Sequence, residues 1–142
     1  MANNKWRIKE AVKIAEDAAL KALRTGAEAI LTEAINEAPI ETGTLRRSGT
    51  VTVGALPDGA QVYEAAESGT EMKDAFPGQE GKEKAVYISF NTPYARRMHE
   101  DLGYTPKRGG GPKYLETPFN ANKDKVLKMA ETKVKKALRD AK

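Results

Sequence analysis

The chain contains no cysteine and only one histidine, His99. The lack of cysteine excludes disulfide bonds, thiolate metal ligands and thiol nucleophiles. A single histidine leaves only one candidate base for a Ser-His-Asp triad and cannot supply a multi-histidine metal site. His99 stands beside Glu100 and Asp101, a set that can bind a metal weakly or act as a base, but a surface or packing role is commoner on a short helix. We therefore expect no enzyme, no cofactor and no metal site.

Long apolar runs are also missing, and aromatic residues make up only 6% of the 142 positions. A membrane-spanning helix needs about 20 predominantly apolar residues, and a signal peptide needs a shorter apolar run after its basic residues. Neither pattern is present, so we expect a protein made in the cytoplasm and not bound to a membrane. The length corresponds to one domain, residues 1–142, with a modest aliphatic core.

Charge is unevenly distributed along the chain, whose net charge is +4. Residues 105–142 carry 11 Lys or Arg against 4 Asp or Glu, which gives +7, and residues 1–104 carry 13 against 16, which gives −3. A basic C-terminal part indicates an acidic partner or nucleic acid. The solvated face of an ordinary amphipathic helix produces the same pattern, so both interpretations stay open.

The two ends of the chain predict long helices. From Asn4 to Glu37, apolar or small residues recur every three or four positions, which is the period of one helical face. Gly26 interrupts this stripe and marks either a close helix contact or a bend. The last helix is predicted to open at Thr117, as N-cap, followed by Pro118 at the first helical position.

The middle of the chain predicts strands. Residues rich in β-branched and aromatic side chains alternate with turn residues, and a short helical pattern follows them. A long helix, grouped strands and a final helix indicate an α+β fold, with the N- and C-terminal helices packed on a small, mainly antiparallel sheet of three to four strands. The predicted strands are Gly49–Gly54, Gln61–Ala65 (joined to the first by a hairpin turn at Leu56–Gly59), Lys84–Phe90 and, as a short fourth, Tyr114–Glu116; the short helix is Tyr94–Leu102.

The segment from Glu67 to Glu83 combines glycines, a proline and many charges. This composition predicts a flexible loop, about residues 67–83. Phe76 is its only aromatic residue. Either Phe76 anchors the loop on the core, or it is a loop tip that buries in a partner, and the sequence does not separate the two.

Three segments carry the most specific pattern in the chain. They read APIETGTLRRS at residues 38–48, NTPYARRMHE at residues 91–100 and KYLETPF at residues 113–119. Each resembles a signature segment of the minor capsid and head–tail joining proteins of tailed bacteriophages. The three occur in that family's order and together run from Ala38 to Phe119.

The resemblance implies a structural virion protein of a tailed phage or prophage, with no enzymatic activity. Such proteins have an α+β fold and complete the neck between head and tail, commonly as a homo-oligomeric ring. The implied partners are other neck, portal-side or tail-tube proteins of the virion, and a monomer in isolation is compatible with this role. Genomic DNA would pass nearby without sequence-specific contact.

The candidate interface residues lie within these segments, where two arginine pairs stand, and in the glycine-rich run just before the third segment. Arginine is favoured at interfaces and binds acidic groups or phosphate, although ordinary solvated charge is an equal alternative. The glycine run lacks the spacing of a phosphate-binding loop, which favours a mobile loop. We expect subunit or partner contacts at Arg46, Arg47, Tyr94, Arg96, Arg97, Gly109, Gly110, Gly111 and Lys113.

A second function stays open beside the first. The last helix carries many cations away from its apolar stripe, as does a small basic protein that binds DNA through phosphates alone. No aromatic residues interleave with these cations, which disfavours a platform for stacking single-stranded bases. The cations are Lys123, Lys125, Lys128, Lys133, Lys135, Lys136 and Arg139.

Overall fold

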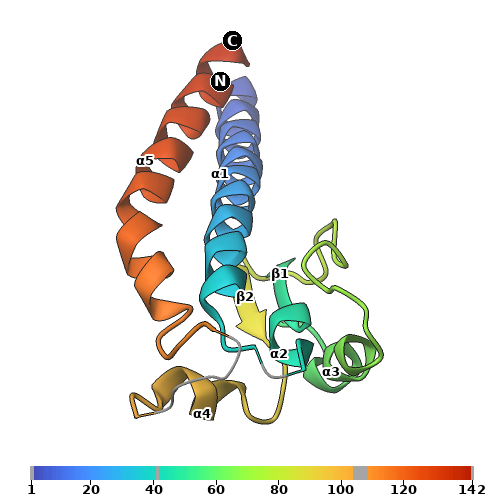
Figure 1. The fold of residues 1–142 in the computed structure, drawn as a ribbon. Helices are drawn as coiled ribbons and strands as arrows, with labels where there is room; N and C mark the ends of the chain where they lie inside the picture. The colour runs from blue at the N-terminus through green and yellow to red at the C-terminus, as the bar shows by residue number, and fades with distance from the viewer. Residues whose placement is uncertain (1, 41, 104–108, 142) are drawn as a thin grey trace.

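The computed structural model describes residues 2–40, 42–103 and 109–141. It confirms the α+β class with long terminal helices, and both the last helix and the sheet pack on the first helix (Figure 1). The elements are α1 (Ala2–Glu37), α2 (Thr44–Arg47), β1 (Gly49–Val53), α3 (Gly59–Glu67), β2 (Val86–Phe90), α4 (Ala95–Glu100) and α5 (Glu116–Asp140).

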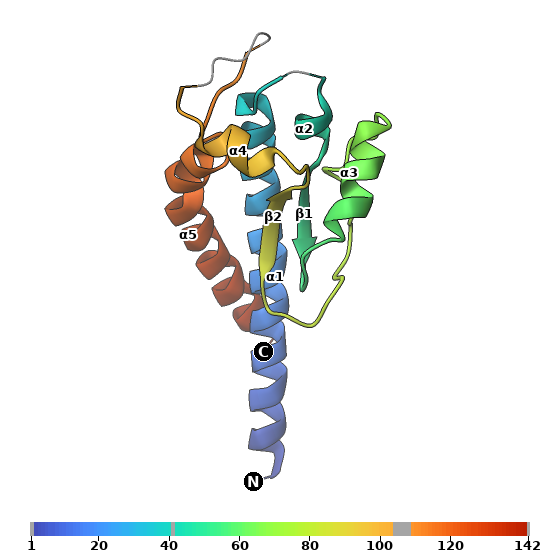
Figure 2. The same ribbon diagram turned by 90° about the horizontal axis from the view of Figure 1, so that it is seen from below.

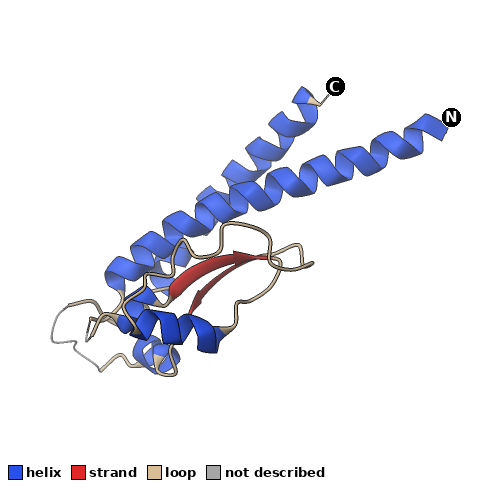
Figure 3. Cartoon of the chain, turned by 90° about the vertical axis from the view of Figure 1, so that its right-hand side faces the viewer, coloured by secondary structure: helices blue, strands red, loops and turns tan. Residues whose placement is uncertain are grey.

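The helices α1 and α5 run antiparallel, with the two chain ends on the same side of the molecule (Figure 3). The 36 residues of α1 correspond to about 54 Å at 1.5 Å per residue, and Figure 2 shows its N-terminal turns extending past the rest of the fold. Of the two interpretations of Gly26, the structure shows the close helix contact. A Cβ atom added to Gly26 would lie 2.4 Å from Cγ1 of Val126 on α5.

We expect Gly26→Ala to destabilise the protein although alanine is the better helix former. The gain in helix propensity is about 1 kcal/mol. The added methyl group meets a β-branched side chain that has few alternative rotamers, and overpacking of this kind costs about 1–3 kcal/mol. The net loss should appear as a lower urea midpoint. The same change in a Val126→Ala background should stabilise, and a loss that persists there would contradict the helix contact as its cause.

Among the described residues, the sheet has two strands. In the described part of the chain, β1 pairs with β2 in antiparallel register, with Val51 opposite Ile88. All five residues of β1 are buried, while those of β2 are half-buried. Side chains of both strands pack on α1, in a cluster of Ala27, Leu31, Ile35, Val51, Val86, Ile88 and Phe90.

The predicted strand at residues 61–65 is wrong, because this segment is part of α3. The turn residues before it begin a helix instead of closing a hairpin. The carboxylate of Asp58 accepts hydrogen bonds from two N–H groups of the first turn of α3, at 3.1 and 3.2 Å, and so caps that helix. Val62 and Ala66, four residues apart, are then buried on one face.

The predicted fourth strand at residues 114–116 is also wrong, because these residues form a turn and the start of α5. Lys113 takes a left-handed conformation, with φ of 57°, and the turn buries the side chain of Tyr114. The helix α5 begins at Glu116, with Leu115 at the N-cap position and no side-chain cap. The predicted cap at Thr117 is therefore wrong by two positions.

Most of the predicted loop at residues 67–83 lacks helix and strand. The guanidinium of Arg24 donates a hydrogen bond to the carbonyl oxygen of Phe76 at 2.7 Å. The ring of Phe76 packs on a small core cluster that contains Val62 and Met72. Of the two interpretations of Phe76, the structure shows the anchor on the core. The flexibility of the loop stays a prediction.

Candidate functional site

The three sequence segments meet at one end of the molecule, where α1 ends and α4 lies beside the start of α5 (Figure 1). We call this the three-segment junction. Each segment contributes buried side chains to one core. The junction consists of Ala38, Leu45, Ala95 and Tyr114, with Phe90, Tyr94, Met98 and Leu115 packed against them.

Tyr114 lies at the centre of the junction and is only 2% exposed. Its hydroxyl group donates a hydrogen bond to the carbonyl oxygen of Ala95 at 2.7 Å. Its ring contacts the rings of Phe90 and His99 edge-on, each at a centroid distance of 5.0 Å. Burial raises the pKa of Tyr114 well above its usual range, so it is a neutral packing residue and no base. Sequence reasoning did not single it out, although it stands inside the third segment.

Arg46 binds the C-terminal end of α1. The last carbonyl groups of a helix have no partner within the helix, and a cation there also favours the helix dipole. Arg46 donates from Nη2 to the carbonyl oxygen of Asn36 and from Nε to that of Ala38, both at 2.8 Å. The N–H of Gly111 donates to the carbonyl oxygen between them, that of Glu37, at 2.9 Å. Three consecutive carbonyl groups are thus satisfied by two of the predicted site residues.

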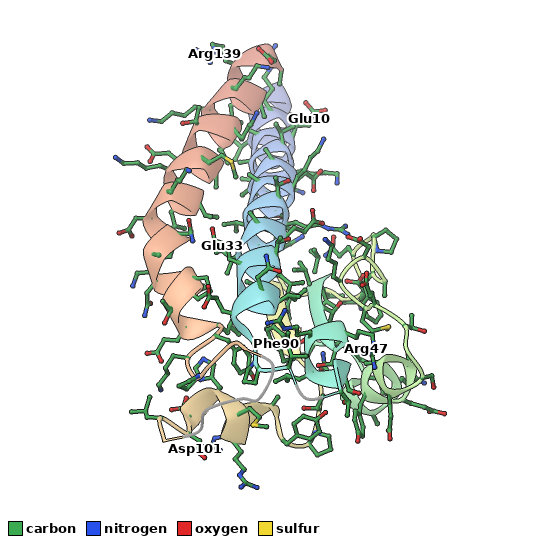
Figure 4. The ribbon with its side chains drawn as sticks, viewed as in Figure 1. Glu10, Glu33, Arg47, Phe90, Asp101 and Arg139 are labelled. Carbon is green, nitrogen blue, oxygen red and sulfur yellow. The ribbon has the colours of Figure 1, made fainter. Side chains whose placement is uncertain are left out.

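Arg47 likewise binds the C-terminal end of a helix, in this case α3. Its Nε donates to the carbonyl oxygen of Ala66, in the last turn of α3, at 2.8 Å, and its Nη2 donates to Oγ1 of Thr44 at 3.3 Å. Figure 4 shows Arg47 beside α3, on the side of the molecule away from α5. The arginine pair therefore holds the ends of two helices, α1 and α3, within one chain.

The glycine run packs against the end of α1. The carbonyl oxygen of Gly109 accepts a hydrogen bond from the N–H of Ile40 at 3.2 Å. Gly110 has φ of 80°, and a Cβ atom on it would lie 2.3 Å from the carbonyl oxygen of Ala38. Only glycine fits this approach without strain. The basic residues just before the run, Lys107 and Arg108, lie outside the described residues.

Lys113 is the centre of a charged cluster that joins α4 to the start of α5. Its ammonium group pairs with the carboxylates of Glu100 and Glu116, the latter at 3.1 Å. Nδ1 of His99 lies 2.8 Å from the Glu100 carboxylate, and Nε2 accepts the N–H of Glu116 at 3.1 Å. Ligand atoms of His99, Glu100 and Glu116 all lie within 4.8 Å of one another. The Lys113 ammonium group and these hydrogen bonds already occupy the ligand atoms, so the cluster is a poor metal site. We call the ion-paired cluster of His99, Glu100, Lys113 and Glu116 the Lys113 latch.

The latch predicts a loss of stability at low pH. The hydrogen bond from Lys113 lowers the pKa of Glu100 from 4.5, its ordinary value. A carboxyl group with a depressed pKa stabilises the fold above its unfolded pKa, and this contribution disappears as pH falls through the folded pKa. The free energy of unfolding in urea should therefore fall less from about pH 7 to about pH 3 in Lys113→Met than in the wild type. Lys123→Met, on α5, is the control because Lys123 has no part in these ion pairs. Parallel pH profiles for the wild type and Lys113→Met would contradict the latch.

Comparison with known proteins places the chain in a family. Residues 5–96 match the model of the HK97-gp10-like family, described as "Bacteriophage HK97-gp10, putative tail-component". The chain belongs to this family. The match runs from α1 into α4 and includes the first segment and part of the second, whereas the third segment and α5 lie beyond it. Comparisons with curated proteins and with solved structures found no match.

Membership of the HK97-gp10-like family confirms the phage resemblance of the sequence. The family is one of phage tail or head–tail components, which are structural proteins of the virion and associate with other virion proteins. Among the described residues, no helix has both the length and the apolar character that a bilayer-spanning segment requires.

Arg96 and Arg97 are the candidate interface residues of this HK97-gp10-like protein whose side chains point to solvent. Both are exposed on α4, and neither side chain forms a hydrogen bond or ion pair with another described residue. Tyr94, by contrast, is half-buried and packs against the junction. The structure therefore separates the predicted residues into a group engaged within the chain and a pair that can reach a partner.

Proposed function

We propose that the protein is a minor capsid or connector component of the head–tail junction, which joins or completes head and tail by assembling into a ring. The family match carries this proposal. The three segments support it, because they build a packing core and two helix caps. An assembly protein needs a rigid subunit with surfaces for its neighbours, and this arrangement provides one.

The distribution of charge supports contact between copies. On α5, seven Lys or Arg stand against four Asp or Glu, which gives +3. Residues 59–83, which form α3 and the loop after it, carry six Glu or Asp against two Lys, which gives −4. The two regions lie on opposite sides of the molecule (Figures 1 and 2). Opposite sides of opposite charge suit the head-to-tail contact from which rings form.

The first experiment is to disrupt the gene in its phage or prophage and to image the particles produced. We expect separate heads alongside free tails. Normal, infectious particles would overturn the proposal. Mass spectrometry of purified wild-type particles should find the protein in them.

The ring contact is tested by reversing charge on each side. Glutamate in place of Lys125, Lys128 and Lys136 on α5 should prevent assembly, and so should lysine in place of Glu67 and Glu71 on the acidic side. All of these side chains are exposed, so the fold should be retained, as circular dichroism can check. An equimolar mixture of the two variants should form mixed pairs, because each retains one native side. Wild-type ring formation by either variant alone would contradict the contact.

A second candidate function is DNA binding through α5. All seven cations of this helix are exposed, and Figure 4 shows Arg139 near its free end, far from the junction. Binding through phosphates would weaken steeply with salt, since each contact releases a counterion. Duplex DNA binding that falls with salt, and that is lost when Lys128, Lys133 and Lys136 become glutamine, would favour this function over the first.

A further inference from the structure

One edge of the sheet, along β2, has no paired strand among the described residues. The N–H of Gly54 donates to the carbonyl oxygen of Ala85 at 2.9 Å, which marks a hydrogen-bonded pair at the end of the ladder. Because such pairs alternate along antiparallel strands, Val86, Ile88 and Phe90 direct their N–H and C=O groups away from β1. No other residue in the described ranges forms a hydrogen bond with these outward groups. The edge is thus a template for another strand.

This edge opens into a groove. β2 lies between β1 and α5 in Figures 1 and 2, and α5 packs on α1 without covering β2. The space has a volume of about 780 Å³. We call it the β2–α5 groove. Its floor is α1 at Leu23, Ala27 and Ile30, its walls are β2 and α5, and the Lys113 latch lies at one end.

The wall that faces β2 is apolar and exposed. Phe119 is 45% exposed and Leu127 is 59% exposed, which makes them two of the few large apolar side chains that reach solvent. The charged residues that line the groove are Lys113, Lys123, Glu100 and Glu116. Their formal charges sum to zero, and Lys113 already pairs with both glutamates. This lining suits an uncharged, apolar occupant and gives no attraction for a phosphate backbone.

We propose that the β2–α5 groove receives an extended, apolar segment of a neighbouring virion protein, which pairs with β2 as a third strand. This inference rests on the proposed role in the virion. The five residues of β2 offer an edge of about 16 Å at 3.3 Å per residue. Main-chain hydrogen bonds to the edge supply affinity, and alternate side chains of the incoming strand contact Leu127 and Phe119.

A second copy of this chain fits the groove less well. The free strand edge that a second copy could offer is the edge of its own β2 that faces away from its own β1. That β2 would bring its β1 with it, on the side away from the β2 of the groove. In the groove, α5 already occupies that side. The groove therefore suits one chain segment bounded by β2 on one side and by a helix on the other.

The proposal is tested by cross-linking in cells that produce the phage. A photo-cross-linking amino acid is placed at position 127 and, as a control, at position 56, where the natural leucine is 63% exposed outside the groove. We expect position 127, and not position 56, to join one contiguous segment of another virion protein. In the isolated complex, the amides of Val86, Ile88 and Phe90 should exchange with solvent more slowly than in the free protein.

Several results would overturn the proposal. They are unchanged amide exchange at β2, a cross-link from position 127 to DNA or to a second copy, equal cross-linking from position 56, or no cross-link at all. We also expect Leu127→Glu to lower the yield of infectious particles by about tenfold or more, since a buried charge without a partner disfavours binding in the groove, and Leu56→Glu to leave the yield unchanged. Cross-links are scored in the cell lysate and do not depend on the result of the gene disruption. Particles that form normally without the gene would overturn the proposed function, and the cross-links would still decide the proposal for the groove.

Discussion

Replacing Gly110 by alanine is expected to lower the free energy of unfolding by about 2–5 kcal/mol. Two costs add. At φ of 80°, a residue with a Cβ atom loses about 1–2 kcal/mol. The Cβ atom would also lie 2.3 Å from the carbonyl oxygen of Ala38 and 2.8 Å from that of Glu37. Both are backbone atoms held by Arg46 and Gly111, so relief of the clash would break the cap of α1.

The neighbouring glycines separate the two costs. Gly109 has φ of 107° but no atom within 4 Å of an added Cβ, so Gly109→Ala should show the conformational cost alone, about 1–2 kcal/mol. Gly111 has neither feature, and Gly111→Ala should stay within about 0.5 kcal/mol of the wild type. Urea unfolding measures all three. Equal losses at Gly109 and Gly110 would contradict the close approach to α1.

The long helices could be predicted because their pattern repeats over many turns. The stripe of small and apolar residues in α1 is long enough to exclude a strand. At Gly26 the sequence left a close helix contact and a bend open, and the structure shows the contact. The strands β1 and β2 were also found at nearly their observed bounds. For these elements, local pattern and tertiary packing agree, which makes sequence reasoning reliable.

The helix α3 could not be predicted from the same pattern. Its nine residues are too few to distinguish a helical period from alternation, and turn residues before it suit a hairpin as well as a helix start. The deciding contact is the Asp58 carboxylate on the first turn, together with the burial of Val62 and Ala66 on one face. This single ambiguity is why the predicted strand at residues 61–65 is absent from the structure.

The junction shows a different limit of sequence reasoning. The sequence points to Arg46 and Arg47, but a pattern of side chains does not reveal backbone carbonyl groups. It cannot tell whether an arginine will bind a helix end of its own chain or an acidic group of another. Tyr114 was missed for a related reason, because the partner of its hydroxyl group is the carbonyl oxygen of Ala95. Only the arrangement of α1, α4 and α5 in space makes these partners known.

Arg46→Ala is expected to lower the free energy of unfolding by about 2–4 kcal/mol. Each hydrogen bond from a charged donor contributes about 1.5–3 kcal/mol, and the sum for two bonds is reduced because the side chain is only half-buried. The change leaves the carbonyl oxygens of Asn36 and Ala38 without their donors, which lie at 2.8 Å. It also removes a cation from the C-terminal end of α1. Urea unfolding measures the loss.

Two further variants show which part of Arg46 matters. Arg46→Lys keeps the cation but cannot donate from a planar fork to two carbonyl groups, so it should recover less than half of the loss. Arg96→Ala removes an exposed arginine without a partner among the described residues and should change stability by less than about 0.5 kcal/mol. If Arg46→Ala were as stable as the wild type yet failed to assemble, the helix cap would be unimportant and Arg46 would act at the interface that the sequence predicted. If it is less stable and assembles once folded at low temperature, its role is to hold the end of α1, and Arg96 and Arg97 become the cations to test for contact with a partner.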